Sequence, residues 1–191
     1  MNALVMGEGS DVARACVERL REDGMTVVLT SADRAVDDAL ELGSRDGVDV
    51  LVTCPEMRVD GSIESTSEAI FRELLAVDLT AVFRVGRVCF EAMRRRGGGS
   101  MIHIASDAGI RAAHDMAAFS VMSAGVIAVA ELFAAEGAAH GIRSNAVCPR
   151  SGTDVAAIVA WLASNESAHV SGATLRVDGA AGAAMVLDTR I

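Results

Sequence analysis

The stretch GIRSNAVCPRSGTDVAAIVAWLASNESAHVSGATLRVDG, residues 141–179, contains the pattern that decides the fold. It predicts a buried strand over 141–149, a helix over 154–164 and a second strand over 173–179. A helix between two apolar strands is typical of a β-α-β unit, in which the strands run parallel. The same alternation upstream would therefore indicate an open parallel sheet.

The alternation does continue toward the N-terminus. Four further apolar runs predict strands, and four stretches with helical spacing predict the helices between them. The predicted strands are 2–7, 25–30, 48–53 and 100–106, and the predicted helices are 10–22, 33–43, 62–96 (two in series, joined near Asp78) and 115–137. We expect one α/β domain over residues 1–191, a Rossmann-like, doubly wound parallel sheet of about six strands.

The composition disfavours several classes of protein. A formal net charge of −9 argues against nucleic acid and anionic membranes as partners. No secretory signal is visible, and the longest apolar run, 116–130, is too short to span a bilayer, so we expect a cytoplasmic protein. The four cysteines lack C-x-x-C spacing, which indicates reduced, mostly buried thiols and no metal site.

Two residue types are missing from the sequence. All 17 basic residues are Arg, and the chain contains no Tyr. A compositional bias can explain Arg in place of Lys on the surface. It cannot supply the phenol or the ammonium group that some catalytic mechanisms require.

Several stretches resemble the short-chain dehydrogenases/reductases, and the resemblance covers nearly the whole chain. The most specific stretches, HGIRSNAVCPR and ASNESAHVSGATLRVDGA, are similar to the last two strands of that family. The other similar stretches are NALVMGEGSDVA, VDVLVTCPE, LLAVDLTAVFRVGR and GGGSMIHIAS. The resemblance implies a Rossmann-like fold. For ordinary members it also implies the NAD(P)-dependent oxidation of alcohols or reduction of carbonyls.

The resemblance also assigns catalytic positions, and most of them are altered here. The family uses a Tyr as general acid/base, a Lys four residues later, a Ser thirteen residues before the Tyr, and an Asn. Ser106 keeps the Ser position, whereas Phe119 replaces the Tyr, Ser123 replaces the Lys, and Asp78 replaces the Asn. Phe has no proton to transfer and Ser has no positive charge, so we expect no catalytic residue at these positions.

A relocated proton donor is an open alternative. His114, Asp115 and Asp107 lie beside the predicted strand and helix, and a His or Asp can act as general acid or base. His103 lies in the middle of a predicted strand, and we expect it to be a structural histidine or to face outward.

The turn that would hold a dinucleotide is altered as well. Such a turn uses glycines so that its backbone can approach the pyrophosphate at a helix N-terminus. Gly7 and Gly9 remain, but Asp11 and Ala13 stand where the family usually has its second and third glycines. Glu8 adds a carboxylate that would repel a pyrophosphate. We therefore expect no cofactor on this chain, and NAD or NADP on an active partner.

Three further segments depart from the family pattern. The Asn-Asn-Ala-Gly segment, which lies against adenosine and ribose in the family, is replaced by Thr-Cys-Pro-Glu at 53–56. Only one helix fits between the strands 25–30 and 48–53, where the family has an additional edge strand. After Pro149 the chain passes almost directly into the next helix, where the family has a substrate lid. We expect a shortened sheet edge and a shortened lid.

Two long helices, about 77–96 and 115–137, are retained, and the second is apolar or small on every face. Such a helix needs cover on both sides. In the family, the corresponding helices contact a partner subunit. We therefore expect an active family member to bind these helices and the C-terminal strand and tail. A helix buried within a monomer is the alternative.

The sequence thus predicts a catalytically inactive subunit that supports an active NAD(P)-dependent dehydrogenase in a hetero-oligomer. This arrangement resembles the heterotetrameric 2-[hydroxy(phenyl)methyl]succinyl-CoA dehydrogenase, which combines active and inactive subunits. One alternative is a divergent alcohol dehydrogenase or ketoreductase with a relocated proton donor. The other is a homo-oligomeric binding or regulatory protein.

Overall fold

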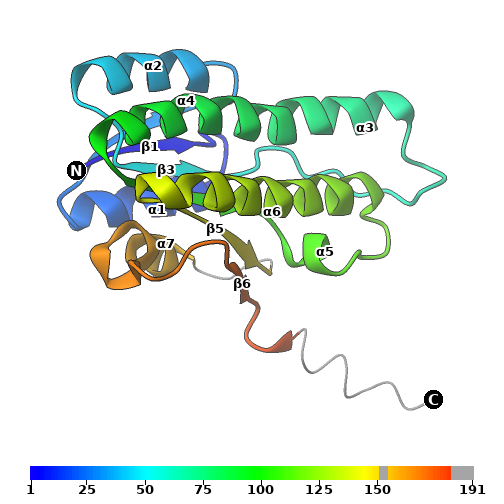
Figure 1. The fold of residues 1–191 in the computed structure, drawn as a ribbon. Coiled ribbons are helices and arrows are strands. Elements are labelled where there is room, and N and C mark those ends of the chain that lie inside the picture. The colour runs from blue at the N-terminus through cyan, green and yellow to red at the C-terminus, as the bar shows by residue number, and fades with distance from the viewer. Residues whose placement is uncertain (151–154, 182–191) are drawn as a thin grey trace.

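A computed structural model of the chain describes residues 1–150 and 155–181, and its six strands form one open parallel sheet (Figure 1). The strands are β1 (Asn2–Met6), β2 (Thr26–Thr30), β3 (Val50–Thr53), β4 (Gly99–Ile104), β5 (Ile142–Pro149) and β6 (Thr174–Val177). Their order across the sheet is β2-β1-β3-β4-β5-β6, and every neighbouring pair is parallel. The predicted doubly wound sheet of about six strands is confirmed.

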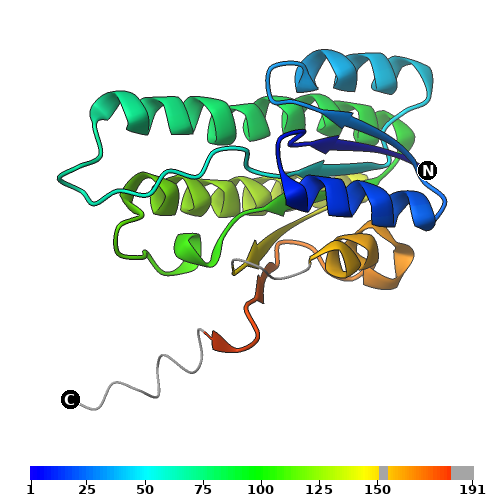
Figure 2. The same cartoon turned by 180° about the vertical axis from the view of Figure 1, so that it is seen from behind.

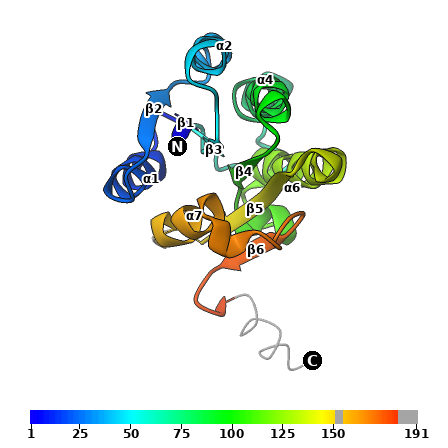
Figure 3. The same ribbon diagram turned by 60° about the vertical axis from the view of Figure 1, so that its left-hand side comes forward.

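Helices cover both faces of this sheet, as Figures 2 and 3 show from behind and from one end. One face carries α1 (Asp11–Glu22) and α7 (Ala156–Ala163), and the other carries α2 (Ala35–Arg45), α4 (Ala81–Arg96) and α6 (Ala117–Gly137). The short helix α5 (Asp107–Ile110) follows β4, and α3 (Glu68–Leu74) precedes α4. The connections also contain short 3₁₀ turns at 138–140 and 165–167.

The sheet has a core on each face because successive strand residues point to opposite sides. In β1, Leu4 and Met6 pack with residues of α2, α4 and α6, whereas Ala3 and Val5 pack with residues of α1 and α7. Strands that are buried on both faces need apolar residues at every position. This burial explains the continuous apolar runs of the sequence.

The predicted pair of helices over 62–96 is confirmed at its junction but wrong at its start. A π-helical turn, Leu75–Thr80, joins α3 to α4 and contains the expected junction residue Asp78. The helix begins at Glu68 because Ser67 caps it, its Oγ accepting a hydrogen bond from the backbone N–H of Ile70 at 3.2 Å. The preceding residues 62–66 instead form a turn, in which the Ser62 hydroxyl accepts a hydrogen bond from a backbone N–H.

The expected short sheet edge is present, since α2 leads directly from β2 to β3 and β2 forms the edge. Only residues 150–155 join β5 to α7, and 151–154, where the predicted lid falls, lie outside the described residues. The predicted contact of the tail also falls mostly outside them, at 182–191. The expectation that the apolar run is too short to span a bilayer is wrong, because the helical segment Ala117–His140 is long and apolar enough to cross a membrane. Half of its apolar window is buried, as in core helices of water-soluble domains.

Candidate functional site

The turn after β1 has the form predicted for a dinucleotide-binding turn, but its first glycine has a packing role. Gly7 has a φ of +128°, and a Cβ built on it would lie 2.8 Å from the carbonyl oxygen of Cys54 at the end of β3. A side chain would therefore be strained and would also clash. Gly9 has open space around the position of a Cβ. The close contact with β3 accounts for Gly7 without any cofactor.

The first turn of α1 follows directly. Ser10 caps this helix, with its Oγ accepting a hydrogen bond from the backbone N–H of Ala13 at 3.4 Å. Asp11 is exposed at the first helical position, and Ala13 is completely buried. The structure thus brings the four predicted turn residues together, with a carboxylate at the helix N-terminus, where a pyrophosphate would lie in a dinucleotide site.

More carboxylates surround this turn. Two arginines lie among them: Arg34 Nη2 lies 3.9 Å from Glu8 Oε2 and 3.8 Å from Asp38 Oδ2. Arg14 pairs with the Asp11 carboxylate, and its Nη1 donates a hydrogen bond to the backbone carbonyl of Glu8 at 3.3 Å. Asp33, the neighbour of Arg34 in the chain, is exposed beside them. The carboxylates therefore outnumber the two guanidinium groups, and the local charge is negative.

The Glu56 side chain is directed toward the same turn. Its Oε1 is buried and has no hydrogen-bond partner among the described residues. Burial raises the pKa of this carboxyl, the backbone N–H groups of Ala32 and Glu8 act to lower it, and the charges of Asp33 and Glu8 raise it further. The Glu56 carboxyl thus lies beside the turn, on the residue that replaces the last glycine of the family's Asn-Asn-Ala-Gly segment.

Asp78, at the Asn position of the family, fastens the loop after β3. It is 1% exposed, and its two carboxylate oxygens accept hydrogen bonds from the backbone N–H groups of Glu56 (2.9 Å) and Met57 (3.2 Å). Burial raises its pKa to about 6, these two hydrogen bonds oppose the rise, and the charge of Glu56 adds to it. Because backbone groups engage both oxygens, Asp78 has a structural role in this chain.

The remaining catalytic positions of the family lie at α5 and α6. Ser106 caps α5, with its Oγ accepting from the N–H of Ala108 and donating to Asp107 Oδ1, each at 3.2 Å. Phe119 and Ser123 lie one turn apart on α6, 8% and 0% exposed. Ser123 Oγ has no hydrogen-bond partner among the described residues. Of these three residues, only Ser106 and Ser123 carry an exchangeable side-chain proton, and the Ser106 hydroxyl donates its proton to the Asp107 carboxylate.

The candidate replacements for the missing Tyr lie close to Ser106. A cavity of about 500 Å³ is lined by Ser106, Asp107 and His114, together with several arginines. His114 is highly exposed, and its Nδ1 lies 2.8 Å from Asp115 Oδ2. Of the three candidate proton donors, the structure therefore brings Asp107 and His114 to the cavity beside Ser106, whereas Asp115 lies outside its lining and contacts His114.

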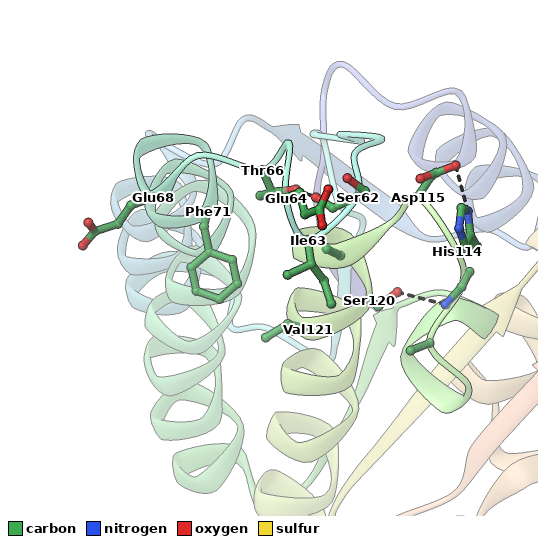
Figure 4. Close-up of a pocket in the computed structure, with 13 residues that line it drawn as sticks. Ser62, Ile63, Glu64, Thr66, Glu68, Phe71, His114, Asp115, Ser120 and Val121 are labelled. Carbon is green, nitrogen blue, oxygen red and sulfur yellow. Dashed lines mark hydrogen bonds and ion pairs between the residues drawn. The ribbon is translucent and has the colours of Figure 1, made fainter.

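A larger cavity, of about 870 Å³, lies between α3 and the start of α6 (Figure 4). Ile63, Phe71 and Val121 point into the space between these helices. Ser120 also lines the cavity, and its Oγ accepts a hydrogen bond from the N–H of Ala113 at 3.3 Å. None of Ser106, Phe119, Ser123 and Asp78 lines it. This cavity is therefore separate from the catalytic positions of the family.

The remaining predictions concern the cysteines and His103. All four cysteines are buried, and no group of metal-ligating side chains occurs in residues 1–150 and 155–181. His103 is completely buried, its Nδ1 lies 2.9 Å from Thr53 Oγ1, and its ring stacks on Phe133. His103 is therefore a structural histidine, and the outward-facing alternative is wrong because β4 is covered on both faces.

An open parallel sheet with a glycine turn after its first strand defines a Rossmann-like protein. The profile of the short chain dehydrogenase family matches residues 31–160. The chain belongs to the short-chain dehydrogenase/reductase family, which confirms the resemblance noted in the sequence.

Individual relatives support this assignment over nearly the full chain. Nodulation protein G of Rhizobium sp. (strain N33) is 30% identical, with 96% of this chain and 97% of that protein covered. The 3-oxoacyl-[acyl-carrier-protein] reductase MabA of Mycobacterium tuberculosis is 26% identical, with 95% and 92% covered. A solved short-chain dehydrogenase/reductase from Burkholderia xenovorans superposes with a TM-score of 0.88 at 23% identity, covering 95% of this chain and 96% of its own, which shows the fold. The alignment with nodulation protein G extends over 239 positions, more than the 191 residues of this chain, so it contains gaps.

Proposed function

We propose that this chain is a non-catalytic subunit that pairs with an active, NAD(P)-dependent member of its family. The observation that carries this proposal is the state of α6, where Phe119 and Ser123 replace the Tyr and Lys of the family and are both buried. Loss of a positioned acid/base costs about 10²–10⁴ in rate. With no Tyr or Lys anywhere in the sequence, this chemistry has no direct substitute.

The electrostatics of the turn support the absence of a cofactor on this chain. Glu8 and Glu56 both place carboxyl groups beside the turn, and Asp11 occupies the first position of α1. Two like charges 4 Å apart repel by about 4 kcal/mol at an effective dielectric constant of 20. Each carboxylate close to the binding position would therefore weaken pyrophosphate binding. In this proposal, NAD or NADP binds only to the active partner.

A surface for that partner is formed by α4 and α6. Gly86 lets these helices approach closely, since a Cβ there would lie 2.5 Å from Phe133 Cε2. These helices carry three exposed large apolar side chains, Phe83, Val121 and Leu132, which are 42%, 50% and 43% exposed in the chain alone. Val121 also lines the cavity beside α3. Large apolar side chains gathered on one exposed face are typical of protein–protein interaction sites.

Charged residues border this apolar face. Arg84 and Arg87 are exposed on α4, and Glu131 and Glu136 are exposed on α6. A polar rim around an apolar centre is the usual anatomy of an interface. The same face could pair with a second copy of this chain, because basic and acidic residues lie on adjacent helices. The outcome of the test below distinguishes these two partners.

The test is co-expression with an active family member encoded next to this chain. We expect the two chains to co-purify in a fixed ratio, as subunits of a tetramer or a smaller assembly. Val121→Arg would place a charge in the apolar centre and should abolish co-purification. Arg45→Gln on α2, away from this face, is the matched control. A chain that stays monomeric beside such a partner contradicts the proposal.

The second candidate is a divergent NAD(P)-dependent oxidoreductase, favoured by the shared cavity of Ser106, Asp107 and His114. In this reading, His114 or Asp107 would donate the proton to a carbonyl near Ser106. The test is consumption of NADH or NADPH with a panel of ketones by the purified chain, compared with His114→Ala and Asp107→Asn. Activity that is lost in either variant would favour this candidate over the first.

We also propose that the protein acts in the cytoplasm. The net charge of −9 and the partial burial of Ala117–His140 within the described fold support this location. Fractionation of cells that express the chain with its natural partner would test it, with the protein expected in the high-speed supernatant.

A further inference from the structure

The cavity of about 500 Å³ next to Ser106 is unusual in this acidic chain because arginines line it. Arg58, Arg111, Arg150 and Arg176 contribute to its wall. They come from the segments after β3, α5 and β5 and from β6 itself. In open parallel sheets, ligands bind outside the carboxyl ends of the strands, which is where this cavity lies.

The positive charge of this cavity is only partly compensated. Two carboxylates, those of Asp107 and Asp178, line it beside the four guanidinium groups, so the lining residues carry a formal charge of 4 − 2 = +2. Arg58 also pairs with a carboxylate outside the lining, since its Nε lies 3.3 Å from Asp60 Oδ1. Arg176 Nε lies 3.9 Å from Asp178 Oδ2. Arg111 and Arg150 form no ion pair with any described residue, in contrast to many other arginines of the chain.

The two ends of the family's cleft therefore have opposite charges in this chain. The turn after β1 gathers carboxylates around Arg34, and the cavity beside Ser106 gathers guanidinium groups. A concave site with one sign of charge concentrates ligands of the opposite sign. An anion is thus attracted to the Ser106 end and repelled from the dinucleotide turn.

We propose that this cavity binds a small oxyanion with two negative charges, a phosphate or a dicarboxylate. The planar guanidinium of Arg donates two parallel hydrogen bonds to a carboxylate or phosphate, a geometry that suits both ligands. Two negative charges match the two guanidinium groups of Arg111 and Arg150, which form no ion pair with any described residue, and the volume suits a small molecule. These guanidinium groups provide the hydrogen-bond donors, because the Ser106 hydroxyl already donates to Asp107 Oδ1. This ligand site does not depend on whether the chain pairs with a partner.

The experiment measures anion binding to the purified chain, or to its complex if the chain is obtained only in that form. Inorganic phosphate and succinate are titrated by calorimetry at low, constant ionic strength, with acetate as the singly charged control. We expect saturable binding of at least one dianion, at least about tenfold tighter than acetate. Tighter binding of phosphate or of succinate shows whether the ligand is a phosphate or a dicarboxylate.

Variants locate the site. Arg111→Gln and Arg150→Gln should each weaken dianion binding by about tenfold or more, the usual loss for a hydrogen bond to a charged group. Arg45→Gln removes the same charge on α2, where Arg45 pairs with Glu41, and should leave binding unchanged. Both cavity arginines are exposed, so equal thermal unfolding of all three variants without anion is the folding control.

Three results would overturn the proposal. The first is that neither phosphate nor succinate shows saturable binding, even at concentrations about 10-fold above those at which acetate gives a calorimetric signal. The second is equal binding by the wild-type chain and the Arg111→Gln/Arg150→Gln double variant. The third is a loss of dianion affinity in Arg45→Gln as large as in the cavity variants. Such a loss would mean that the anion responds to the overall charge of the chain and not to this cavity.

Discussion

Two buried titratable groups should give the unfolding free energy opposite dependences on pH. Burial lowers the pKa of His103 from 6.5 to about 4, and burial raises the pKa of Asp78 from 3.8 to about 6. Between pH 6.5 and 4 the unfolded chain binds a proton at His103 that the folded chain does not, so acidification destabilises the fold. Between pH 6 and 3.8 the folded chain binds a proton at Asp78 that the unfolded chain does not, so acidification stabilises it.

The size of each effect follows from these pKa values. A difference of one pKa unit corresponds to about 1.4 kcal/mol, so each group contributes up to about 3 kcal/mol over its full range. Going from pH 7 to pH 4.5 captures about 2 kcal/mol of each contribution. In the wild-type chain the two contributions nearly cancel. Removing one group should therefore reveal the other.

Matched variants separate the two groups. Asp78→Asn removes the carboxyl and should lose about 2 kcal/mol more stability than the wild type between pH 7 and 4.5. The double variant Thr53→Val/His103→Leu removes both partners of a buried hydrogen bond, so neither partner is left unpaired. Between pH 7 and 4.5, its unfolding free energy should rise by about 2 kcal/mol relative to that of the wild type. Other titrating groups affect all three proteins alike and cancel in the comparison.

The assay is urea denaturation followed by the fluorescence of Trp161, the one tryptophan of the sequence, at pH 7.0, 5.5 and 4.5. Circular dichroism provides a second probe of the same transition. Parallel pH dependences in the three proteins would refute the reasoning, because they would mean that neither group titrates differently in the folded chain.

Two further sets of substitutions test the packing of the altered site. Gly7→Ala should destabilise the chain by roughly 1–3 kcal/mol, because its φ is positive and its Cβ would meet Cys54, whereas Gly9→Ala should be nearly neutral; equal melting temperatures would contradict the packing role of Gly7. Ser123→Ala should leave stability unchanged or raise it by up to about 1 kcal/mol, because the buried Ser123 hydroxyl has no partner. Ser123→Lys should lower stability by several kcal/mol, as thermal denaturation would reveal, because it buries an ammonium group; a stable Lys variant would mean that a space for the family's lysine remains.

The fold was predictable from the sequence because its signals are local. Apolar runs, helical spacing and caps such as Ser10 are each visible within a few residues, and the parallel, doubly wound sheet followed from the β-α alternation. The start of α3 was missed because the segment 62–67 contains several serine and threonine residues that can either cap a helix or close a turn. In the structure Ser62 closes a turn and Ser67 caps the helix, a choice that depends on the packing of α3.

The candidate site was predictable only in part. The substitutions at Phe119 and Ser123 are visible because they lie at fixed distances from Ser106 along the chain. The arginine cavity was not predicted, since Arg58 and Arg176 are far apart in sequence and are brought together only by the order of the strands. A search for basic residues after each predicted strand would have found most of them. The direction of the Glu56 side chain also depends on the loop that Asp78 fastens.

The central claim is that this chain binds an active dehydrogenase subunit but does not itself catalyse the reaction. The most direct measurement is the subunit composition and cofactor content of the assembly formed with an active family member, by native mass spectrometry in the presence of NADH or NADPH. We expect both chains in a fixed ratio, with one dinucleotide per active subunit and none on this chain. A dinucleotide bound to this chain, or the absence of a mixed assembly, would contradict the claim.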